Sequence, residues 1–519
     1  MSTVVERPAE SEAPVQRGRL STNLVTNVGN LVLSTLVSIW YVPFLVHRLG
    51  PAAYGLIPLA TALTSYMSLI TTALNSAVAR FLTIAVEQGD RERANLVFNT
   101  SLWGSLGLAV LLLLPAGYAI SHIETLVRVP TGYSTEVRWL FACATGAFLL
   151  NQLKTPFDVS TICRNRLDLR NLVSVGETLC RVGVVVGLFA VYNPRLRFAG
   201  MGILAGTMLS SLGAVRLWRV LTPSLRVRPR SFDWATLRSL TAVGGWVSLN
   251  AIGSLLYSNA DLFIANRMCT PEQSGRYAAL TQLPLVMQSL MGTIAAVFLP
   301  TTLIFFARED ISGLVAYLRR AMRIQGLLLS LPVALVCGFG RPLLSLWLGH
   351  GFAGMAPLLG LMVFYLCILG PVYPLFTLQL TVNRMQVPGM VMMAMGFVNL
   401  GLAILLAGPM GWGLYGIAAA TASTLALQSL LFAAPYAAHV LHRPWHTFLS
   451  GMVPLLTLAA ATTALCALLS ARGSLTSWPR FLTAVLLASV LYMAAAYRWL
   501  LSDEERRAVL RMVPRGSKA

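Results

Sequence analysis

The sequence predicts an all-α polytopic membrane protein with about 14 transmembrane helices, namely two pseudo-symmetric six-helix lobes plus two C-terminal helices. Of its 519 residues, 56% are hydrophobic and 11% are charged, which is too little charge to cover a soluble protein of this size. Apolar runs of about 20 residues, the length that crosses a bilayer as a helix, recur along the whole chain. A set of identical residues also repeats at an offset of 220 positions, which indicates a duplicated helical half.

The apolar segments follow one another with short loops between them. Each must form a helix, because the hydrocarbon core offers no hydrogen-bonding partner to a free backbone. The predicted spans of the first lobe lie at 22–46, 55–79, 96–120, 139–162, 171–192 and 198–219. Those of the second lobe lie at 240–265, 277–305, 322–340, 355–380, 388–408 and 412–436, and the two additional spans lie at 447–469 and 479–500. Loops this short leave no room for a soluble catalytic domain.

Composition shifts along the chain predict its organisation. The segment between the two lobes is polar, basic and proline-bearing, as expected of a cytoplasmic linker. The predicted parts are a cytoplasmic N-terminal tail (1–21), a first lobe (22–220), a cytoplasmic basic linker (221–239), a second lobe (240–440), two additional transmembrane helices (441–500) and a cytoplasmic basic tail (501–519).

The internal repeat comprises eleven identities in 61 ungapped positions, well above what this biased composition gives by chance. In the first half they are Asn30, Ser34, Leu36, Ser38, Pro51, Gly55, Thr61, Leu63, Met67, Ile84 and Asp90. In the second half they recur as Asn250, Ser254, Leu256, Ser258, Pro271, Gly275, Thr281, Leu283, Met287, Ile304 and Asp310. Because the offset covers an even number of helices, the two halves are expected to be parallel, related by an axis along the membrane normal.

The net charge of +20 is distributed asymmetrically. With the N-terminus in the cytoplasm, the inner segments hold 28 of the 39 Lys and Arg residues and the outer loops hold 10, while Arg181 lies within a span. This is the positive-inside pattern, which needs no nucleic acid as partner. It predicts a multi-pass protein of the bacterial inner membrane with both termini cytoplasmic, and anionic lipids as partners of the basic segments.

Polar residues form a stripe on two predicted helices that correspond in the repeat. In the first span they are Asn23, Asn27, Asn30, Ser34 and Ser38, whose spacings of 4, 3, 4 and 4 place them on one face. In the seventh span they are Asn250, Ser254, Ser258 and Asp261. Such stripes either join helices by hydrogen bonds or line a cavity. Their presence in both symmetric helices favours a central cavity, although packing between helices remains an alternative.

Ionisable residues within the spans are few. Glu177 and Arg181 are four residues apart in the fifth span, so they can pair on one face, either as a structural pair or at a functional site. Lys154 and Asp158 have the same spacing near the inner end of the fourth span.

Two further ionisable residues stand alone. Arg80 closes the second span at its inner end, where its side chain can reach the headgroups. Asp261 lies toward the outer end of the seventh span and is the best candidate for a functional carboxylate. An isolated acid at membrane depth is costly unless it pairs or binds a proton.

Motifs of enzymes and cofactor sites are absent from the sequence. There is no Walker loop, and His439, His442 and His446 beside Trp445 are more typical of an interfacial loop than of a metal site. We therefore expect no metal, no cofactor and no enzymatic activity. Uphill transport would have to use an ion gradient or the gradient of the substrate.

Four segments resemble a known family. The stretches FLVHRLGPAAYGLIPLA and ALNSAVARFLTIAVEQGDRERAN are similar to the start of bacterial polysaccharide flippases of the Wzx type, in the multidrug/oligosaccharidyl-lipid/polysaccharide (MOP) exporter superfamily. YSNADLFIANRMCTPEQSGRYAAL resembles that family's seventh-to-eighth span signature, and FGRPLLSLWLG its ninth-span exit. The resemblance covers roughly residues 22–440.

The resemblance implies two lobes facing each other and a function in polysaccharide biosynthesis. Members move undecaprenyl-diphosphate-linked oligosaccharides from the cytoplasmic to the outer leaflet by alternating access. A polysaccharide polymerase and chain-length machinery are then candidate partners. On this hypothesis Arg80 and Arg181 capture the diphosphate. The path of the headgroup would be lined by Asn30, Ser34, Asn250 and Ser254. The carboxylates for gating or ion coupling would be Asp261 and Glu177.

Three alternatives remain open. A lipid II flippase also has fourteen spans, but the arginine-rich first span expected of that branch is missing, since 23–40 carries no charge. A small-molecule exporter of the superfamily would typically have twelve spans. A glycan polymerase or ligase would typically carry a large outer loop, and no predicted outer loop here reaches that size.

Overall fold

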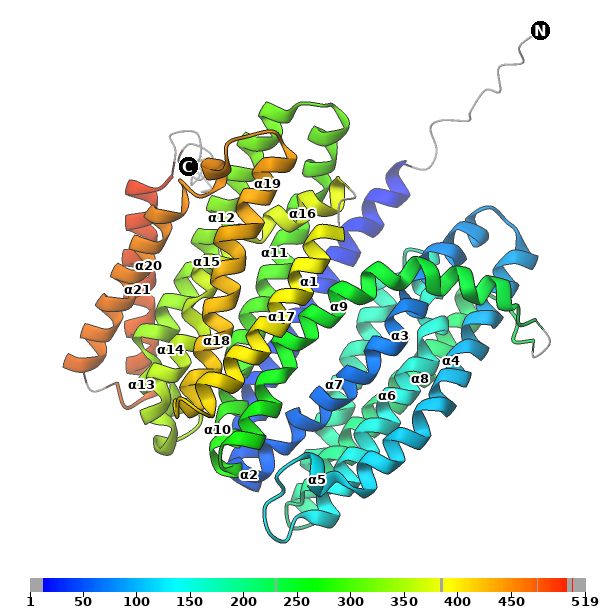
Figure 1. The fold of residues 1–519 in the computed structure, drawn as a ribbon, viewed down its shortest axis with the longest axis horizontal. Coiled ribbons are helices and arrows are strands. Elements are labelled where there is room, and N and C mark those ends of the chain that lie inside the picture. Colours follow the sequence, from blue (N-terminus) through cyan, green and yellow to red (C-terminus); the bar gives the residue numbers. More distant parts are fainter. Residues whose placement is uncertain (1–12, 229–230, 383–385, 474, 502–505, 507–519) are drawn as a thin grey trace, which may run out of the picture. The chain divides into compact units, whose positions relative to one another are not determined.

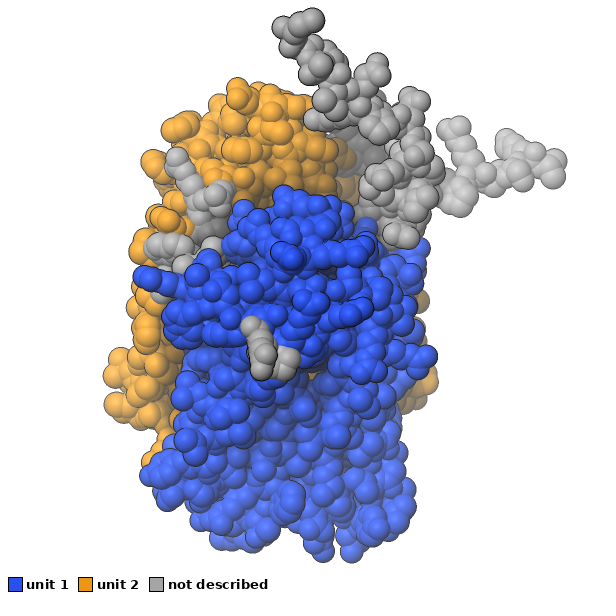
Figure 2. Space-filling model, turned by 90° about the vertical axis from the view of Figure 1, so that its right-hand side faces the viewer, with its two compact units in different colours: residues 1–255 blue, residues 256–519 orange. Residues whose placement is uncertain are grey.

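The computed structural model describes residues 13–228, 231–382, 386–473, 475–501 and 506. Within them every assigned element is a helix, which confirms the predicted fold class. The chain divides into two compact units, Met1–Leu255 and Leu256–Ala519 (Figure 2). Most of the two predicted tails lies outside the described residues.

Unit 1 is a bundle of long helices (Figure 1). Two very short helices, α2 and α5, interrupt the connections between them. The elements are α1 (Ala13–Leu49), α2 (Pro51–Tyr54), α3 (Leu56–Glu87), α4 (Arg91–Ser121), α5 (Ile123–Leu126), α6 (Ser134–Cys163), α7 (Leu167–Val191), α8 (Leu196–Leu221) and the first part of α9 (Trp234–Met268).

Unit 2 contains more interrupted helices. Its first half holds the end of α9, α10 (Pro271–Leu280), α11 (Gln282–Ala307), α12 (Ile311–Gly338), α13 (Gly340–Trp347), η1 (His350–Met355), α14 (Ala356–Phe364), α15 (Leu366–Val372) and α16 (Pro374–Thr381). Its second half holds α17 (Gln386–Ala407), α18 (Gly413–Leu427), η2 (Gln428–Ala433), α19 (Ala434–Val440), η3 (Trp445–Phe448), α20 (Met452–Arg472) and α21 (Trp478–Trp499). The predicted additional spans form α20 and α21, and α20 packs along α12.

Each of the predicted spans coincides with a helix or a run of consecutive helices. Twelve segments among the described residues are long and apolar enough to cross a membrane. The two long helices outside this set are α6, which carries several charged residues, and α9. The protein is therefore a multi-pass membrane protein, and the exact number of 14 spans stays a prediction.

Two of the repeated residues have the same structural role in both halves. Asp90 caps the N-terminus of α4 by accepting a hydrogen bond from the backbone of Arg93 at 2.9 Å. Asp310 caps α12 in the same way, with the backbone of Gly313 donating at 2.8 Å. The carboxylates satisfy otherwise unpaired N–H groups and interact favourably with the helix dipole. This part of the repeat therefore preserves helix starts.

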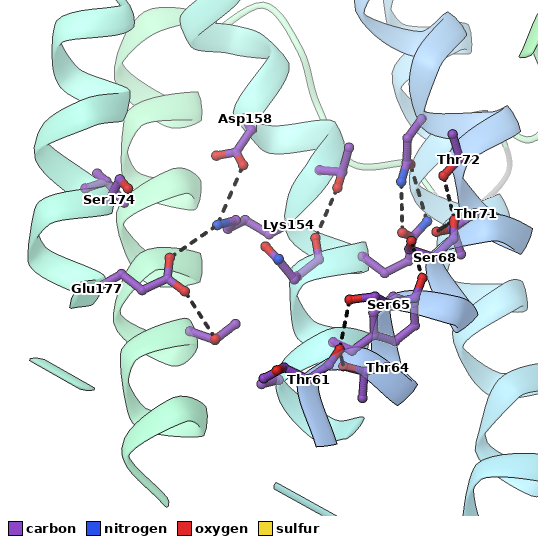
Figure 3. Close-up of a pocket in the computed structure, with 18 of the residues that line it drawn as sticks. Thr61, Thr64, Ser65, Ser68, Thr71, Thr72, Lys154, Asp158, Ser174 and Glu177 are labelled. Carbon is purple, nitrogen blue, oxygen red and sulfur yellow. Dashed lines mark hydrogen bonds and ion pairs between the residues drawn. The ribbon is translucent and has the colours of Figure 1, made fainter. Parts of the chain in front are cut away.

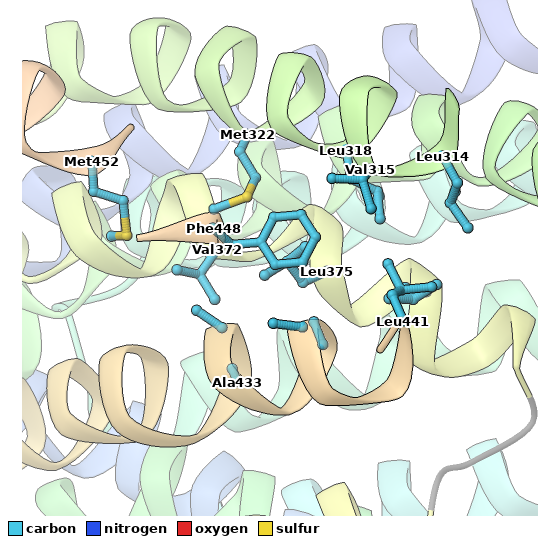
Figure 4. Packing of buried hydrophobic residues seen from close by; sticks show 14 residues of the cluster. Leu314, Val315, Leu318, Met322, Val372, Leu375, Ala433, Leu441, Phe448 and Met452 are labelled. Carbon is cyan, nitrogen blue, oxygen red and sulfur yellow. The ribbon is translucent and has the colours of Figure 1, made fainter. Parts of the chain in front are cut away.

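Each unit has its own apolar core. In unit 2, side chains of α12, α15 and α16 pack against small residues of η2 and α19, with Phe448 filling the space between them (Figure 4). In unit 1, a comparable cluster includes Leu82 of α3, Phe98 of α4 and Val159 of α6, and it also includes Leu225 from the predicted linker.

Candidate functional site

A cavity of about 830 Å³ lies within unit 1 (Figure 3). Its walls are formed by α3, α6, α7 and α8, and most of the side chains that line it are polar. This is unusual for the interior of a membrane-spanning bundle, because polar groups facing hydrocarbon are costly. A lining of this kind suits a polar occupant.

One wall of the cavity is a stripe of hydroxyl side chains on α3. These side chains recur every three or four residues, so they share one helical face. They are Thr61, Thr64, Ser65, Ser68, Thr71 and Thr72, and Asn75 continues the stripe (Figure 3).

The hydroxyl groups of this wall donate to their own helix. Ser68 donates to the carbonyl of Ser65 at 2.6 Å, and Thr72 donates to the carbonyl of Ser68 at 2.6 Å. A hydroxyl that gives its proton to the backbone keeps acceptor lone pairs on its oxygen. In this arrangement the wall offers acceptors, which suit a ligand rich in O–H donors.

The opposite wall carries a cation held between two carboxylates. The Nζ of Lys154 lies 3.8 Å from Asp158 Oδ2 and 3.8 Å from Glu177 Oε2 (Figure 3). It also donates to the hydroxyl of Ser210 at 3.2 Å. The hydroxyl of Thr207 donates to the other oxygen of Glu177 at 3.3 Å. The two carboxylates compensate the charge of Lys154. Its side chain is 13% exposed and still lines the cavity.

Two amide side chains join the walls. Asn75 Nδ2 donates to Gln152 Oε1 at 2.9 Å, and Gln152 Nε2 donates back to Asn75 Oδ1 at 3.3 Å. Gln152 Nε2 also lies 3.4 Å from the hydroxyl of Ser105 on α4. This pairing satisfies buried polar groups and fixes α3 against α6.

The cavity extends along much of the bundle, since its lining on α3 runs from Thr61, near the start of that helix, to Ala79. At one end it is lined by the last turns of α6 and by the first turns of α7, where Arg170 is exposed. This is the end that the charge distribution predicts to be cytoplasmic.

The residues predicted from the sequence fall in different places in unit 1. Glu177 lines the cavity, and among the described residues its ion-pair partner is Lys154. Arg181 lies one turn further along α7, outside the cavity lining, and its buried Nε has no hydrogen-bond partner in the described part of the chain. Arg80 is exposed and also outside the lining. Asn30 accepts a hydrogen bond from Ser34 at 3.4 Å on the half-buried face of α1.

The corresponding polar stripe on α9 is described in part. Ser254 is exposed, while the side chain of Asn250 lies outside the described residues. The assignment of both stripes to a cavity therefore stays a prediction.

Asp261 lies in a separate buried cluster in unit 2. It is 7% exposed, and its Oδ2 accepts hydrogen bonds from Thr421 at 2.8 Å and from Tyr277 at 3.3 Å. Its Oδ1 and the Nδ2 of Asn399 are buried without a hydrogen-bond partner among the described residues. The cluster therefore combines a carboxylate with hydroxyl and amide oxygens, a donor set suited to a proton or a small hard cation. No group of three or more His, Cys, Asp or Glu side chains in the described chain could hold a metal ion.

The hydroxyl wall is not among the site residues that the sequence predicts. Its signal was present, since the Ser and Thr residues between positions 61 and 72 follow a helical period. The stripe carries no charge, and only Thr61 of it recurs in the internal repeat, so neither of those patterns marks it.

Comparison with known proteins places the chain in a family. The family described as "Polysaccharide biosynthesis protein" matches residues 24–303, more than half of the chain. The chain belongs to this family. It is also 33% identical over 493 residues to the "Uncharacterized membrane protein EpsK" of Bacillus subtilis (strain 168), covering 95% of this chain and 98% of that protein. These matches confirm the resemblance to Wzx-type flippases of the MOP superfamily.

Solved structures show the same fold. "Lipid II flippase MurJ, inward closed conformation" aligns with a TM-score of 0.70 and 12% identity, covering 91% of this chain and 98% of that one. An inward-facing multidrug resistance MATE family transporter of the MOP superfamily aligns with a TM-score of 0.67 and 13% identity, covering 83% of this chain and 96% of that one. At these identities the likeness establishes the architecture of a transporter superfamily and no more.

Proposed function

We propose that this protein moves an undecaprenyl-diphosphate-linked oligosaccharide from the cytoplasmic to the outer leaflet of the bacterial inner membrane by alternating access. The observation that carries the proposal is the hydroxyl-lined cavity inside a bundle of membrane helices in a polysaccharide biosynthesis family. A sugar chain and a diphosphate are both very costly in hydrocarbon, so they need a polar enclosure during the crossing. The prenyl chain can stay in the lipid.

The cavity offers groups for both parts of such a headgroup. The α3 wall supplies acceptors for sugar hydroxyls, and Lys154 and Arg170 supply cationic donors for phosphate oxygens. Arg80 and Arg181 stay candidates for first capture of the diphosphate. If Arg80→Ala and Arg181→Ala variants, made at normal levels, restore export in a flippase-null strain, that capture role is wrong.

The sugar-binding role of the wall is tested in cells that lack the chromosomal gene. A Ser68→Ala/Thr72→Val variant removes two hydroxyls from the cavity and is expected to lower surface polysaccharide at least about tenfold, given the cost of leaving sugar hydroxyls unpaired. Thr83→Val is the matched control, because Thr83 lies on the same helix outside the cavity lining and contacts Cys163. Wild-type export by the double variant at wild-type protein levels would refute this role.

We further propose that the Asp261 cluster couples transport to an ion gradient. This role is supported by the burial of the carboxylate and by its Oδ1, which has no hydrogen-bond partner in the part of the chain that the structure describes. An Asp261→Asn variant is expected to lose the dependence of transport on the applied ion gradient and on pH. Transport by that variant with an unchanged pH and ion dependence would exclude coupling through Asp261.

The basic segments support a cytoplasmic position for both termini and contacts with anionic lipids. Lipid II flipping and small-molecule export remain alternatives, since the fold serves both kinds of protein. If the protein rescues a strain depleted of its lipid II flippase but does not rescue polysaccharide export, lipid II flipping is favoured.

A further inference from the structure

Unit 2 contains a groove of about 500 Å³ that the proposed transport does not use. It lies where α12 ends, bounded by α13, α14 and α20. Its floor is buried and consists of Gly338, Gly340 and Ala356, whereas its rim is exposed. A space of this size is within the range of about 300–1,000 Å³ that holds small-molecule ligands.

The groove exists because small residues line it. At Gly340, an added Cβ would lie 3.2 Å from the Cβ of Ala356, so the floor is tightly packed. At Gly360, by contrast, an added Cβ would meet nothing within 4 Å. The hollow therefore lies next to Gly360, on the face of α14 that looks toward α20, where Ala467 lines the groove and is exposed.

A single cationic side chain stands among the residues that line the groove. Arg341 is exposed in the first turn of α13, and neither Asp nor Glu is among the lining residues described. No ion pair to a carboxylate is found for its guanidinium in the described part of the chain. A planar guanidinium at the end of a membrane helix is well suited to bind a phosphate group.

We propose that this groove binds an anionic phospholipid, with its phosphate on Arg341 and an acyl chain in the hollow beside Gly360. The bilayer that surrounds a membrane helix supplies such a ligand, and the groove combines the two features that a phospholipid needs. Its lining is mainly small and apolar below the rim, and the cation lies at the end of α12 that the charge distribution predicts to be extracytoplasmic. The bound lipid fills the space between α14 and α20.

The test is native mass spectrometry of the purified full chain in detergent, titrated with phosphatidylglycerol. Arg341→Gln removes the phosphate contact, and Gly360→Leu fills the hollow from a helical position that has room for a side chain. The matched controls are Arg472→Gln, at the end of α20 outside the lining, and Gly354→Leu, where a side chain also meets nothing within 4 Å.

Each groove variant is expected to weaken phosphatidylglycerol binding by about tenfold. This is the effect of losing one charge-assisted contact, for Arg341→Gln, or an equivalent apolar contact, for Gly360→Leu. The control variants should bind phosphatidylglycerol as the wild type does. Equal binding by wild type and both groove variants, with unchanged thermal stability, would overturn the proposal. Displacement of phosphatidylglycerol by an equimolar amount of undecaprenyl phosphate would also overturn it, because the groove would then hold a prenyl lipid.

Discussion

Lys154 illustrates how a charge is kept inside a membrane protein. Its ammonium group faces Asp158 and Glu177 from two different helices and donates to Ser210 on a third. Such clusters are often close to neutral for stability as a whole, but removing one member leaves the others uncompensated. The arrangement keeps a cation available at the cavity surface.

Replacing Lys154 by Met is expected to lower the free energy of unfolding by about 1–3 kcal/mol, because two partly buried carboxylates lose their counter-ion. The additional change Glu177→Gln should restore part of this stability and none of the polysaccharide export. Thermal unfolding in detergent and export in cells measure the two effects separately. A Lys154→Met protein that exports normally would show that the cation has no part in transport.

The residue scale is also where the sequence was least informative. Glu177 and Arg181 were correctly placed on one helix, and their spacing allows a pair. In the structure the carboxylate of Glu177 lies beside Lys154, a residue of another helix. Spacing along one helix cannot show which neighbouring helix supplies the partner, so the cavity could not be assembled from the sequence.

At the scale of elements, two asparagines of α4 hold the predicted linker in place. Asn95 donates to the carbonyl of Ser224 at 3.1 Å and accepts from the backbone N–H of Arg226 at 2.8 Å. Asn99 donates to the carbonyl of Arg226 at 2.9 Å and accepts from the N–H of Arg228 at 2.6 Å. Asn95 and Asn99 are four residues apart on α4, a rise of about 6 Å along the helix. Their backbone partners are two residues apart in an extended segment, a distance of about 6.6 Å, so the two spacings match.

The variant Asn95→Ala/Asn99→Ala should therefore release the segment 224–228 while leaving the bundle folded. Hydrogen exchange of its backbone amides is expected to rise at least about tenfold, since each lost pair contributes roughly 1 kcal/mol. Exchange mass spectrometry of the full chain measures this, with Asn151→Ala as a control on α6. Unchanged protection of 224–228 would show that Leu225, buried in the core, suffices to hold the segment.

The contact between α7 and α8 depends on two glycines of α8 spaced four residues apart. A Cβ on Gly202 would lie 2.8 Å from the carbonyl oxygen of Arg181, and one on Gly206 would lie 2.7 Å from that of Glu177. These distances are shorter than real side-chain contacts, so the helices approach this closely because the residues are glycine.

Gly206→Leu is accordingly expected to destabilise unit 1 by about 1–3 kcal/mol through overpacking and to displace Glu177 from the cavity. Gly183→Leu is the control, because a side chain at that position of α7 meets nothing within 4 Å. Thermal unfolding of both variants decides the matter. Equal melting temperatures for wild type and Gly206→Leu would mean that α7 and α8 can separate without cost.

At the scale of the whole molecule, hydropathy and the repeat predicted most of the architecture. Apolar length determines where helices form in a membrane, and that information is local in the sequence. The repeat indicates a duplicated helical half, and the structure adds that its members Asp90 and Asp310 each cap the start of a helix. The cavity, the linker contacts and the lipid groove depend on packing between helices far apart in the sequence, which no single segment specifies.

We propose that the whole protein carries a lipid-linked oligosaccharide through its hydroxyl-lined cavity. This transport is measured most directly in proteoliposomes that contain the purified protein and an undecaprenyl-diphosphate oligosaccharide, with a membrane-impermeant glycosidase added outside. Wild-type protein should expose the inner-leaflet pool to cleavage, and Ser68→Ala/Thr72→Val should do so at least about tenfold more slowly. Cleavage limited to the outer-leaflet pool with wild-type protein, as in empty liposomes, would show that the protein does not move this lipid.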